Sequence, residues 1–151
     1  MSTEHYEDLV EQLCAAVQIP DVDTVLARGS LEVDGFEVLL DRFDSDPDAM
    51  YLNFDYGVAT AGRTLPIFQL MLEANLTVYA QDQAQLGLCP DTGCILLIVR
   101  IPFGPEVDGQ ALADTLAHYV EHGRYWKNNL VNSSDEMFDG LCSGNYLWIR
   151  A

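Results

Sequence analysis

The sequence predicts a single-domain α+β protein, an antiparallel sheet flanked by helices in the order helix, three strands, helix, two strands, helix. Three observations carry this prediction. Apolar residues recur at helical spacing in three segments, they alternate with polar residues in the segments between, and turn-forming sequences separate the strands. The 151 residues suffice for one domain with a hydrophobic core. We expect residues 1–151 to form it, with a core over about residues 4–130 and a C-terminal extension over residues 131–151.

The first predicted element is a helix that ends before Pro20. Its apolar residues are spaced three or four apart and therefore share one face. They are Tyr6, Leu9, Val10, Leu13, Cys14 and Val17. Proline disfavours the helical conformation in the residue before it, which fixes the end of the helix.

Three strands are predicted next, as an antiparallel meander. Asp34-Gly35 is a strong signal for a two-residue hairpin, because both turn positions take positive φ. Apolar and polar residues alternate over residues 36–41 and again over residues 50–56. An acidic turn over residues 44–48 separates these two runs.

The second long helix is predicted to begin near Thr64, which we expect to cap it. Its apolar residues lie on more than one face. They are Leu65, Ile67, Phe68, Leu70, Met71, Leu72, Leu76, Val78 and Tyr79. A helix that is apolar nearly all round must be covered on more than one side. The sheet covers one side, and we expect a second subunit to cover the other, which predicts a dimer of this chain with itself or with a related protein.

A last hairpin and a last helix complete the predicted domain. Leu86 and Leu88 lead into the turn Pro90–Gly93, and residues 94–99 leave it as a continuous apolar run, typical of a strand buried on both faces. The helix begins after Asp108 and carries one apolar stripe. The stripe consists of Leu112, Leu116, Tyr119, Val120, Gly123, Trp126 and Leu130.

The net charge restricts the partners. The chain has 7 Lys and Arg residues against 24 Asp and Glu residues, a formal charge of −17 at pH 7. Such a surface repels phosphate backbones and anionic lipids, so we expect neither nucleic-acid nor membrane binding, but a basic or apolar partner. No apolar run is long enough to cross a bilayer, and residues 1–5 lack the features of a secretory signal. We therefore expect a cytoplasmic protein.

The sequence contains no specific catalytic, metal-binding or cofactor motif. His118 and His122 have the i, i+4 spacing that can chelate a metal. However, they lie at the margin of the apolar stripe, and the sequence indicates no third ligand beside them. The acidic turn over residues 44–48 opens like a calcium loop, yet Ala49 and Asp55 replace the Gly and Glu that such a loop needs. We expect a solvated helix surface and a plain turn, no cofactor and no enzyme.

The four cysteines are predicted to be free thiols. They are Cys14, Cys89, Cys94 and Cys142. Only Cys89 and Cys94 are close in sequence, and their spacing is not that of a zinc ribbon or a thioredoxin-like site. Pairing of either with a distant histidine would make a nucleophile, but structural thiols are far commoner.

Four segments in combination resemble the Tir chaperone (CesT) family, the class I chaperones of bacterial type III secretion. The resemblance covers about residues 4–130. The segments are Tyr51-Leu52-Asn53-Phe54-Asp55-Tyr56-Gly57, Leu65-Pro66, Leu70-Met71-Leu72-Glu73-Ala74-Asn75-Leu76 and Leu86-Gly87-Leu88-Cys89-Pro90-Asp91-Thr92-Gly93. The resemblance implies an acidic, cytoplasmic α+β homodimer that binds the N-terminal region of one or a few secreted effectors. It further implies that the segment is held extended and soluble, without ATP or catalysis.

The resemblance also implies where partners bind. Effector pockets are expected along the first helix and the adjoining meander, with Leu9, Leu13, Val33, Phe36 and Val38 as candidates. The alternative for each of these residues is an ordinary place in the core. The dimer contact is expected to use the second long helix and the strand after the last turn. Its candidates are Leu70, Met71, Leu76, Leu96 and Ile98.

Two rival functions and one segment stay open. The same fold could serve a regulator, as a co-chaperone or anti-activator, or a small metal-dependent enzyme could use His118 and His122. The apolar end of the extension, residues 146–149, either packs on its own domain, covers a binding groove or touches the partner.

Overall fold

The computed structural model describes residues 3–59 and 62–128, with residues 80–82 described by their backbone alone. This part of the chain forms four helices and one five-stranded antiparallel sheet. In chain order the elements are α1 (Thr3–Ala16), α2 (Val22–Arg28), β1 (Ser30–Val33), β2 (Phe36–Phe43), β3 (Asp46–Val58), α3 (Thr64–Asp82), β4 (Ala84–Leu88), β5 (Cys94–Pro102) and α4 (Gly109–Trp126). The expected C-terminal extension, including Cys142 and residues 146–149, lies outside the described residues.

The α+β class and the predicted order of long elements are confirmed, and the short helix α2 is an addition. Asp21 caps this helix by accepting a hydrogen bond from the Thr24 backbone N–H at 3.1 Å, and Gly29 ends it in the left-handed conformation at φ 66°. The helix has only 7 residues and buries only Val25. It is therefore too short to show an apolar period in the sequence.

The strands pair in the order β1-β2-β3-β5-β4, and every pair is antiparallel. The hairpin between β1 and β2 turns at Asp34 and Gly35, whose φ angles of 49° and 82° confirm the predicted two-residue turn. Thr64 is the first helical residue of α3 and not its cap, which is Arg63 without a side-chain hydrogen bond.

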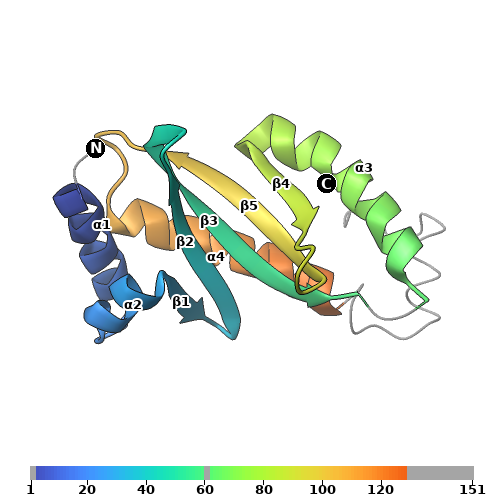
Figure 1. The fold of residues 1–151 in the computed structure, drawn as a ribbon, viewed down its shortest axis with the longest axis horizontal. Coiled ribbons are helices and arrows are strands. Elements are labelled where there is room, and N and C mark those ends of the chain that lie inside the picture. The colour runs from blue at the N-terminus through green and yellow to red at the C-terminus, as the bar shows by residue number, and fades with distance from the viewer. Residues whose placement is uncertain (1–2, 60–61, 129–151) are drawn as a thin grey trace.

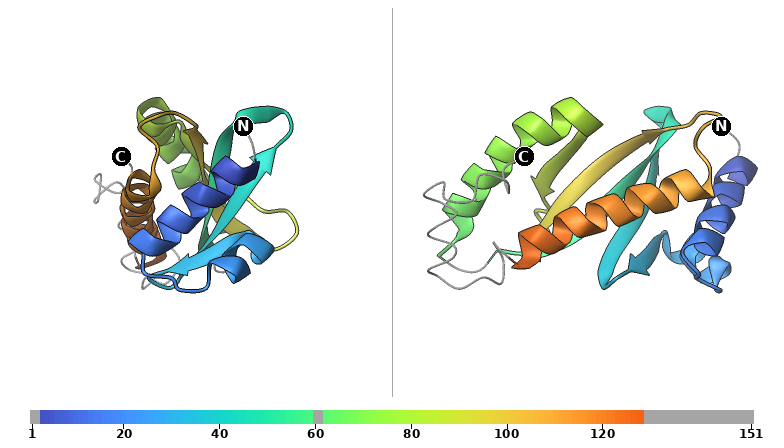
Figure 2. Two further views of the ribbon diagram at one scale, coloured as in Figure 1. Left: turned by 90° about the vertical axis from the view of Figure 1, so that its left-hand side faces the viewer. Right: turned by 180° about the vertical axis from the view of Figure 1, so that it is seen from behind.

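One face of the sheet carries the hydrophobic core (Figures 1 and 2). Helix α4 lies along this face, α1 packs against α4 at the β1 end, and α3 packs beside β4 at the other end. The side chains that point into the core alternate along the strands. The largest of them are Met50, Leu52, Phe54, Tyr56, Ile95 and Leu97, all fully buried with Leu112 and Leu116 of α4.

The other face of the sheet is not covered by a helix in the described part of the chain, and Figure 1 looks onto it. Strand β5 was expected to be buried on both sides, but in the single chain Ile95, Leu97 and Val99 are buried while Leu96 and Ile98 are partly exposed. A continuous apolar run therefore marks a strand with one side in the core and an apolar side facing outward. No described helix is long and apolar enough to span a bilayer.

Candidate protein-interaction surfaces

Helix α3 presents an outward apolar stripe, which we call the α3 stripe and define as Leu65, Leu72, Leu76 and Tyr79. These side chains are 73%, 70%, 80% and 61% exposed. Their spacing of seven, four and three residues places them on one side of the helix. The opposite side carries the residues that pack on the domain, namely Ile67, Leu70, Met71, Ala74 and Val78, all buried. The domain therefore covers only one side of a helix that is apolar on two.

An apolar groove of about 240 Å³ runs beside the stripe, between α3 and β4. It is lined by Phe68, Met71, Leu72, Asn75, Leu86 and Leu88. Asn75 ties the helix to the strand, because its amide donates to the Leu86 carbonyl at 3.1 Å and accepts from the Leu86 N–H at 2.7 Å. β4 is an edge strand, so this side chain occupies backbone groups that an added strand would use.

The uncovered sheet face combines apolar side chains with a paired polar cluster. Leu39 is 37% and Phe43 48% exposed, and Leu96 and Ile98 are partly exposed on the same face. At one end Arg100 holds Asp46 through two hydrogen bonds of 2.6 and 2.9 Å.

The Asp46 carboxylate also accepts a hydrogen bond from the Tyr51 hydroxyl, at 2.6 Å. The hydrogen bonds from Arg100 and Tyr51 lower the pKa of Asp46 to about 2. A second carboxylate on this face, that of Asp41, accepts a hydrogen bond from the Asn53 amide. These polar groups satisfy one another, and the partly exposed apolar side chains on the same face offer a contact surface.

The five side chains predicted to contact an effector divide into two groups. Leu9, Leu13, Phe36 and Val38 lie in the core, with exposures between 0% and 5%. Val33, at the end of β1, is partly exposed. In this conformation a partner can touch Val33 directly, whereas the other four contribute to the packing beneath α1 and the meander.

The five side chains predicted to contact a second subunit also fall into two groups, one facing outward and one buried. Leu76 belongs to the α3 stripe, and Leu96 and Ile98 lie partly exposed on the uncovered sheet face. Leu70 and Met71 are buried against the domain, although Met71 also lines the groove. Both predicted elements therefore have apolar outward faces.

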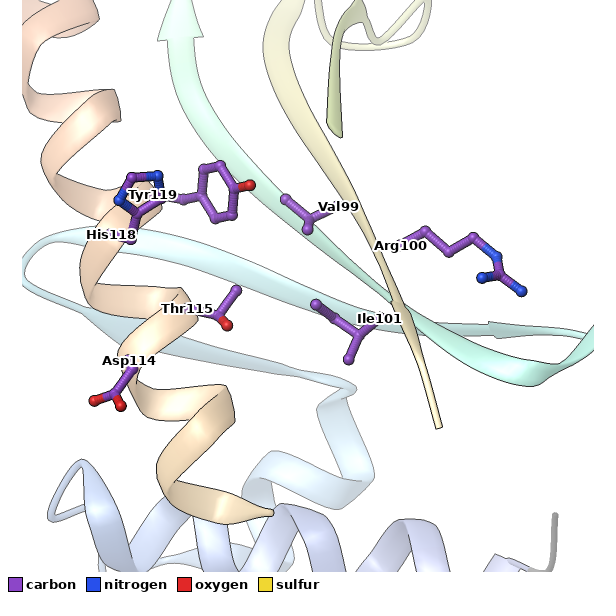
Figure 3. Close-up of a pocket in the computed structure, with 7 residues that line it drawn as sticks. All are labelled: Val99, Arg100, Ile101, Asp114, Thr115, His118 and Tyr119. Carbon is purple, nitrogen blue, oxygen red and sulfur yellow. The ribbon is translucent and has the colours of Figure 1, made fainter. Parts of the chain in front are cut away.

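The histidine pair on α4 lies in two different environments. His118 is exposed beside a shallow cavity of about 370 Å³ between α4 and β5 (Figure 3). His122 is partly buried, with its Nδ1 3.1 Å from the hydroxyl of the buried Tyr56. In Figure 3 Thr115 points toward β5, while Asp114 points away from it. Within residues 3–59 and 62–128, no three His, Cys, Asp or Glu side chains gather closely enough to hold a metal ion.

The model of the Tir chaperone protein (CesT) family matches residues 9–127. The chain belongs to this family. A search of curated protein sequences finds no significant match.

Three solved structures resemble this CesT-family chain. A chain in the crystal structure of the ExsC–ExsE complex has a TM-score of 0.58 and 20% identity, over 84% of this chain and 99% of that one. A chain in the HopA1–SchA chaperone–effector complex has a TM-score of 0.59 and 17% identity, over 81% and 92%. A chain in the heterodimeric ExoU–SpcU complex from the type III secretion system of Pseudomonas aeruginosa has a TM-score of 0.52 and 17% identity, over 70% and 85%. At these identities the comparisons establish the shared fold.

Several outward residues of this CesT-family chain were not singled out as contact residues from the sequence. They are Leu65, Leu72, Tyr79, Leu88, Leu39 and Phe43. The first three could have been found from the sequence, because the 3.6-residue period of a helix assigns its apolar residues to separate stripes. For Leu39 and Phe43 the signal was weaker, since the strand alternation does not say which neighbouring strands form an uncovered face.

Proposed function

We propose that this protein is a type III secretion chaperone. In this function it binds the N-terminal region of one or a few effector proteins and keeps that region soluble and ready for secretion, without ATP, cofactor or catalysis. The observation that carries the proposal is the CesT-family match over residues 9–127. The likeness to chains of chaperone–effector structures supports it at the level of the fold. As a chaperone of effectors before their export, the protein would act in the bacterial cytoplasm.

The proposed functional unit is a homodimer that joins two copies of the α3 stripe. Four large apolar side chains, each more than half exposed, are a costly surface for a single chain in water. A two-fold contact places the same stripe on both sides of the interface, so each copy covers the other. Leu76, Leu96 and Ile98 are the predicted residues with outward surface for this contact, and Leu70 and Met71 support the helix from beneath.

The proposed effector surface is the uncovered sheet face at Leu39 and Phe43, beside the β1 edge. Val33 lies at the end of this edge strand, on the side that packs against the core, and can contact a segment added to the edge. An extended segment gains backbone hydrogen bonds by adding to a sheet edge and gains specificity from side chains in apolar pockets. The β4 edge is occupied at Leu86 by Asn75, which favours the β1 edge for such an addition. Leu9, Leu13, Phe36 and Val38 would shape this surface from within the core.

The negative net charge of the protein favours an effector segment, here called the client segment, that carries positive charge. A formal charge of −17 favours a client segment with Lys or Arg beside its apolar anchors, because encounter is then electrostatically steered. We expect the rate of association to fall as salt is added, while dissociation from the apolar surface changes little.

The test is a tagged pull-down from the native host without nucleotide, followed by mass spectrometry of the bound proteins and light scattering of the complex. We expect one secreted protein, held through its N-terminal region by two copies of the chain. Capture of a transcriptional regulator instead would favour the co-chaperone or anti-activator alternative. A monomer that captures no protein would contradict the proposal.

A matched pair of variants locates the effector surface. Phe43 on the sheet face and Tyr125 on α4 are each 48% exposed aromatic side chains. Phe43→Asp should abolish recovery of the client, and Tyr125→Asp should retain it. Equal recovery by both variants would show that the sheet face is not the client surface.

A further inference from the structure

The hairpin between β4 and β5 places Cys89 opposite Cys94. The ladder between β4 and β5 ends with the pair Leu88 and Ile95. Cys89 follows Leu88 and Cys94 precedes Ile95, so the two cysteines lie opposite each other just beyond this last pair. The Cys89 N–H donates to the Cys94 carbonyl at 2.9 Å, and the Gly93 N–H donates to the Cys89 carbonyl at 2.8 Å. The two cysteines are therefore held opposite each other at the mouth of the turn.

This arrangement is compatible with a bond between the two sulfur atoms. Opposed residues of an antiparallel pair have Cα atoms about 4.5–5.5 Å apart. One backbone hydrogen bond, from the Cys89 N–H to the Cys94 carbonyl at 2.9 Å, joins the two cysteines in this arrangement. Disulfides form when the Cα atoms lie roughly 4.4–6.8 Å apart. Both side chains are partly exposed, and both are free thiols in the structure.

The turn also favours the reactive form of one thiol. Hydrogen bonding of the Thr92 side chain and of the Thr92 and Asp91 backbone to the Cys89 thiolate lowers the pKa of Cys89. Cys14 differs, because burial raises its pKa and its side chain is fully buried. Among the cysteines that the structure describes, Cys89 is the one with the features of a nucleophilic thiol.

We propose that Cys89 and Cys94 form a redox-active dithiol that hydroperoxides oxidise to an intrachain disulfide. The Cys89 thiolate attacks one peroxide oxygen, so an S–O bond forms, the O–O bond breaks and hydroxide leaves. The sulfur becomes a sulfenic acid, and the peroxide is reduced. The Cys94 sulfur then attacks the Cys89 sulfur, the S–S bond forms, and the S–O bond breaks with loss of water. Two thiols and one hydrogen peroxide thus give one disulfide and two waters.

The dithiol lies directly beside the apolar groove between α3 and β4. Leu88, directly before Cys89, lines the apolar groove beside α3. Cross-linking the mouth of the hairpin would fix the strand end that carries this side chain. The oxidation itself does not depend on the proposed chaperone function, and its test requires no client.

The test uses the full chain, hydrogen peroxide and peptide mapping. Trypsin releases residues 64–100, which contain Cys89 and Cys94 alone, while Cys14 and Cys142 fall in other peptides. After oxidation and alkylation we expect this peptide without alkyl groups and lighter by two hydrogens than the unalkylated reduced peptide. Cleavage before Asp82 and Asp91 should leave the fragment that contains Cys89 joined to the fragment that contains Cys94 until a reductant is added. Alkylation of both cysteines after peroxide, or pairing of either with Cys142 or with a second chain, would overturn the proposal.

Single variants test the order of the two steps. In Cys94→Ser the sulfenic acid at Cys89 has no partner and should be trapped by dimedone. In Cys89→Ser the labelling of Cys94 after peroxide should be several-fold slower. Thr92→Val removes one hydrogen-bond donor and should slow oxidation of Cys89, with the fold checked by circular dichroism. Equal rates in Cys89→Ser and Cys94→Ser would contradict the assignment of Cys89 as the attacking thiol.

Discussion

The dimer proposal predicts a large loss of affinity from a change that barely affects the single chain. Leu76 is 80% exposed and lies in the middle of the α3 stripe. Leu76→Ala removes three carbons, and burial contributes about 0.8 kcal/mol per methylene, or about 2.4 kcal/mol for a fully buried side chain. Scaled by the 80% that is exposed, the loss is about 2 kcal/mol per copy. The contact is two-fold, so the dimer loses about 4 kcal/mol, close to a thousandfold in Kd.

The assay is a dilution series followed by light scattering or sedimentation velocity. Wild type, Leu76→Ala and the control Leu39→Ala are compared at the same concentrations. Leu39 is the same side chain, is 37% exposed and lies on β2, on the uncovered sheet face and away from α3. We expect the midpoint of dissociation to move by two to three orders of magnitude for Leu76→Ala and to stay in place for Leu39→Ala.

Two results would refute this reasoning. If Leu76→Ala dimerises with wild-type affinity, the α3 stripe is not the dimer contact. If the variant lowers the unfolding free energy of the monomer by much more than ~0.5 kcal/mol, Leu76 contributes to the fold of the single chain instead. Urea denaturation at protein concentrations below the dimer dissociation constant separates these cases. The protein is then monomeric, so the measured free energy of unfolding no longer includes the contribution of the dimer contact.

Three further predictions concern the core and the sheet face. Gly123→Ala should destabilise the domain by about 1–3 kcal/mol or more, because the new Cβ would lie 2.3 Å from Tyr56 Cε1. The control Gly104→Ala, whose nearest contacts are at 3.5 Å, should change the urea midpoint little. Tyr56→Phe should cost about 1 kcal/mol in the same assay, because it removes the buried hydrogen bond to the Tyr119 carbonyl at 2.7 Å; an unchanged midpoint would contradict this. The pKa of Asp46 is depressed from 3.8 to about 2 in the folded protein, so its contribution to stability is present above pH 3.8 and lost as the pH falls toward 2. Arg100→Gln should raise that pKa toward 3.8 in an NMR titration, and an unmoved pKa would show that Arg100 is not its main cause.

Whether a segment was predicted correctly depends on how close together in the sequence the residues that determine its structure lie. The Asp34-Gly35 turn was predicted correctly because its conformation depends on two adjacent residues. The start of α4 after Asp108 was also predicted, and there the Asp108 side chain accepts a hydrogen bond from the Ala111 N–H at 2.9 Å. Helix α2 was not predicted, because its 7 residues are too few for a period and only its caps define it.

The contact residues were harder to predict than the elements that carry them. Leu9 and Leu76 are both apolar residues at helical spacing, yet one is 2% and the other 80% exposed. Spacing identifies a face of a helix but does not say whether the domain covers it. That depends on where the sheet and the other helices lie, which involves residues distant in sequence.

The sequence by itself determined the α+β class, the positions of the long helices and strands, the resemblance to CesT chaperones and the excess of acidic charge. These properties follow from period, turn chemistry and composition, all of which act over short stretches of chain. Only the tertiary structure decided the strand order, which side of α3 packs on the domain, and which face of the sheet is uncovered. Each of these depends on which distant segments meet, because burial and register are properties of the packed chain.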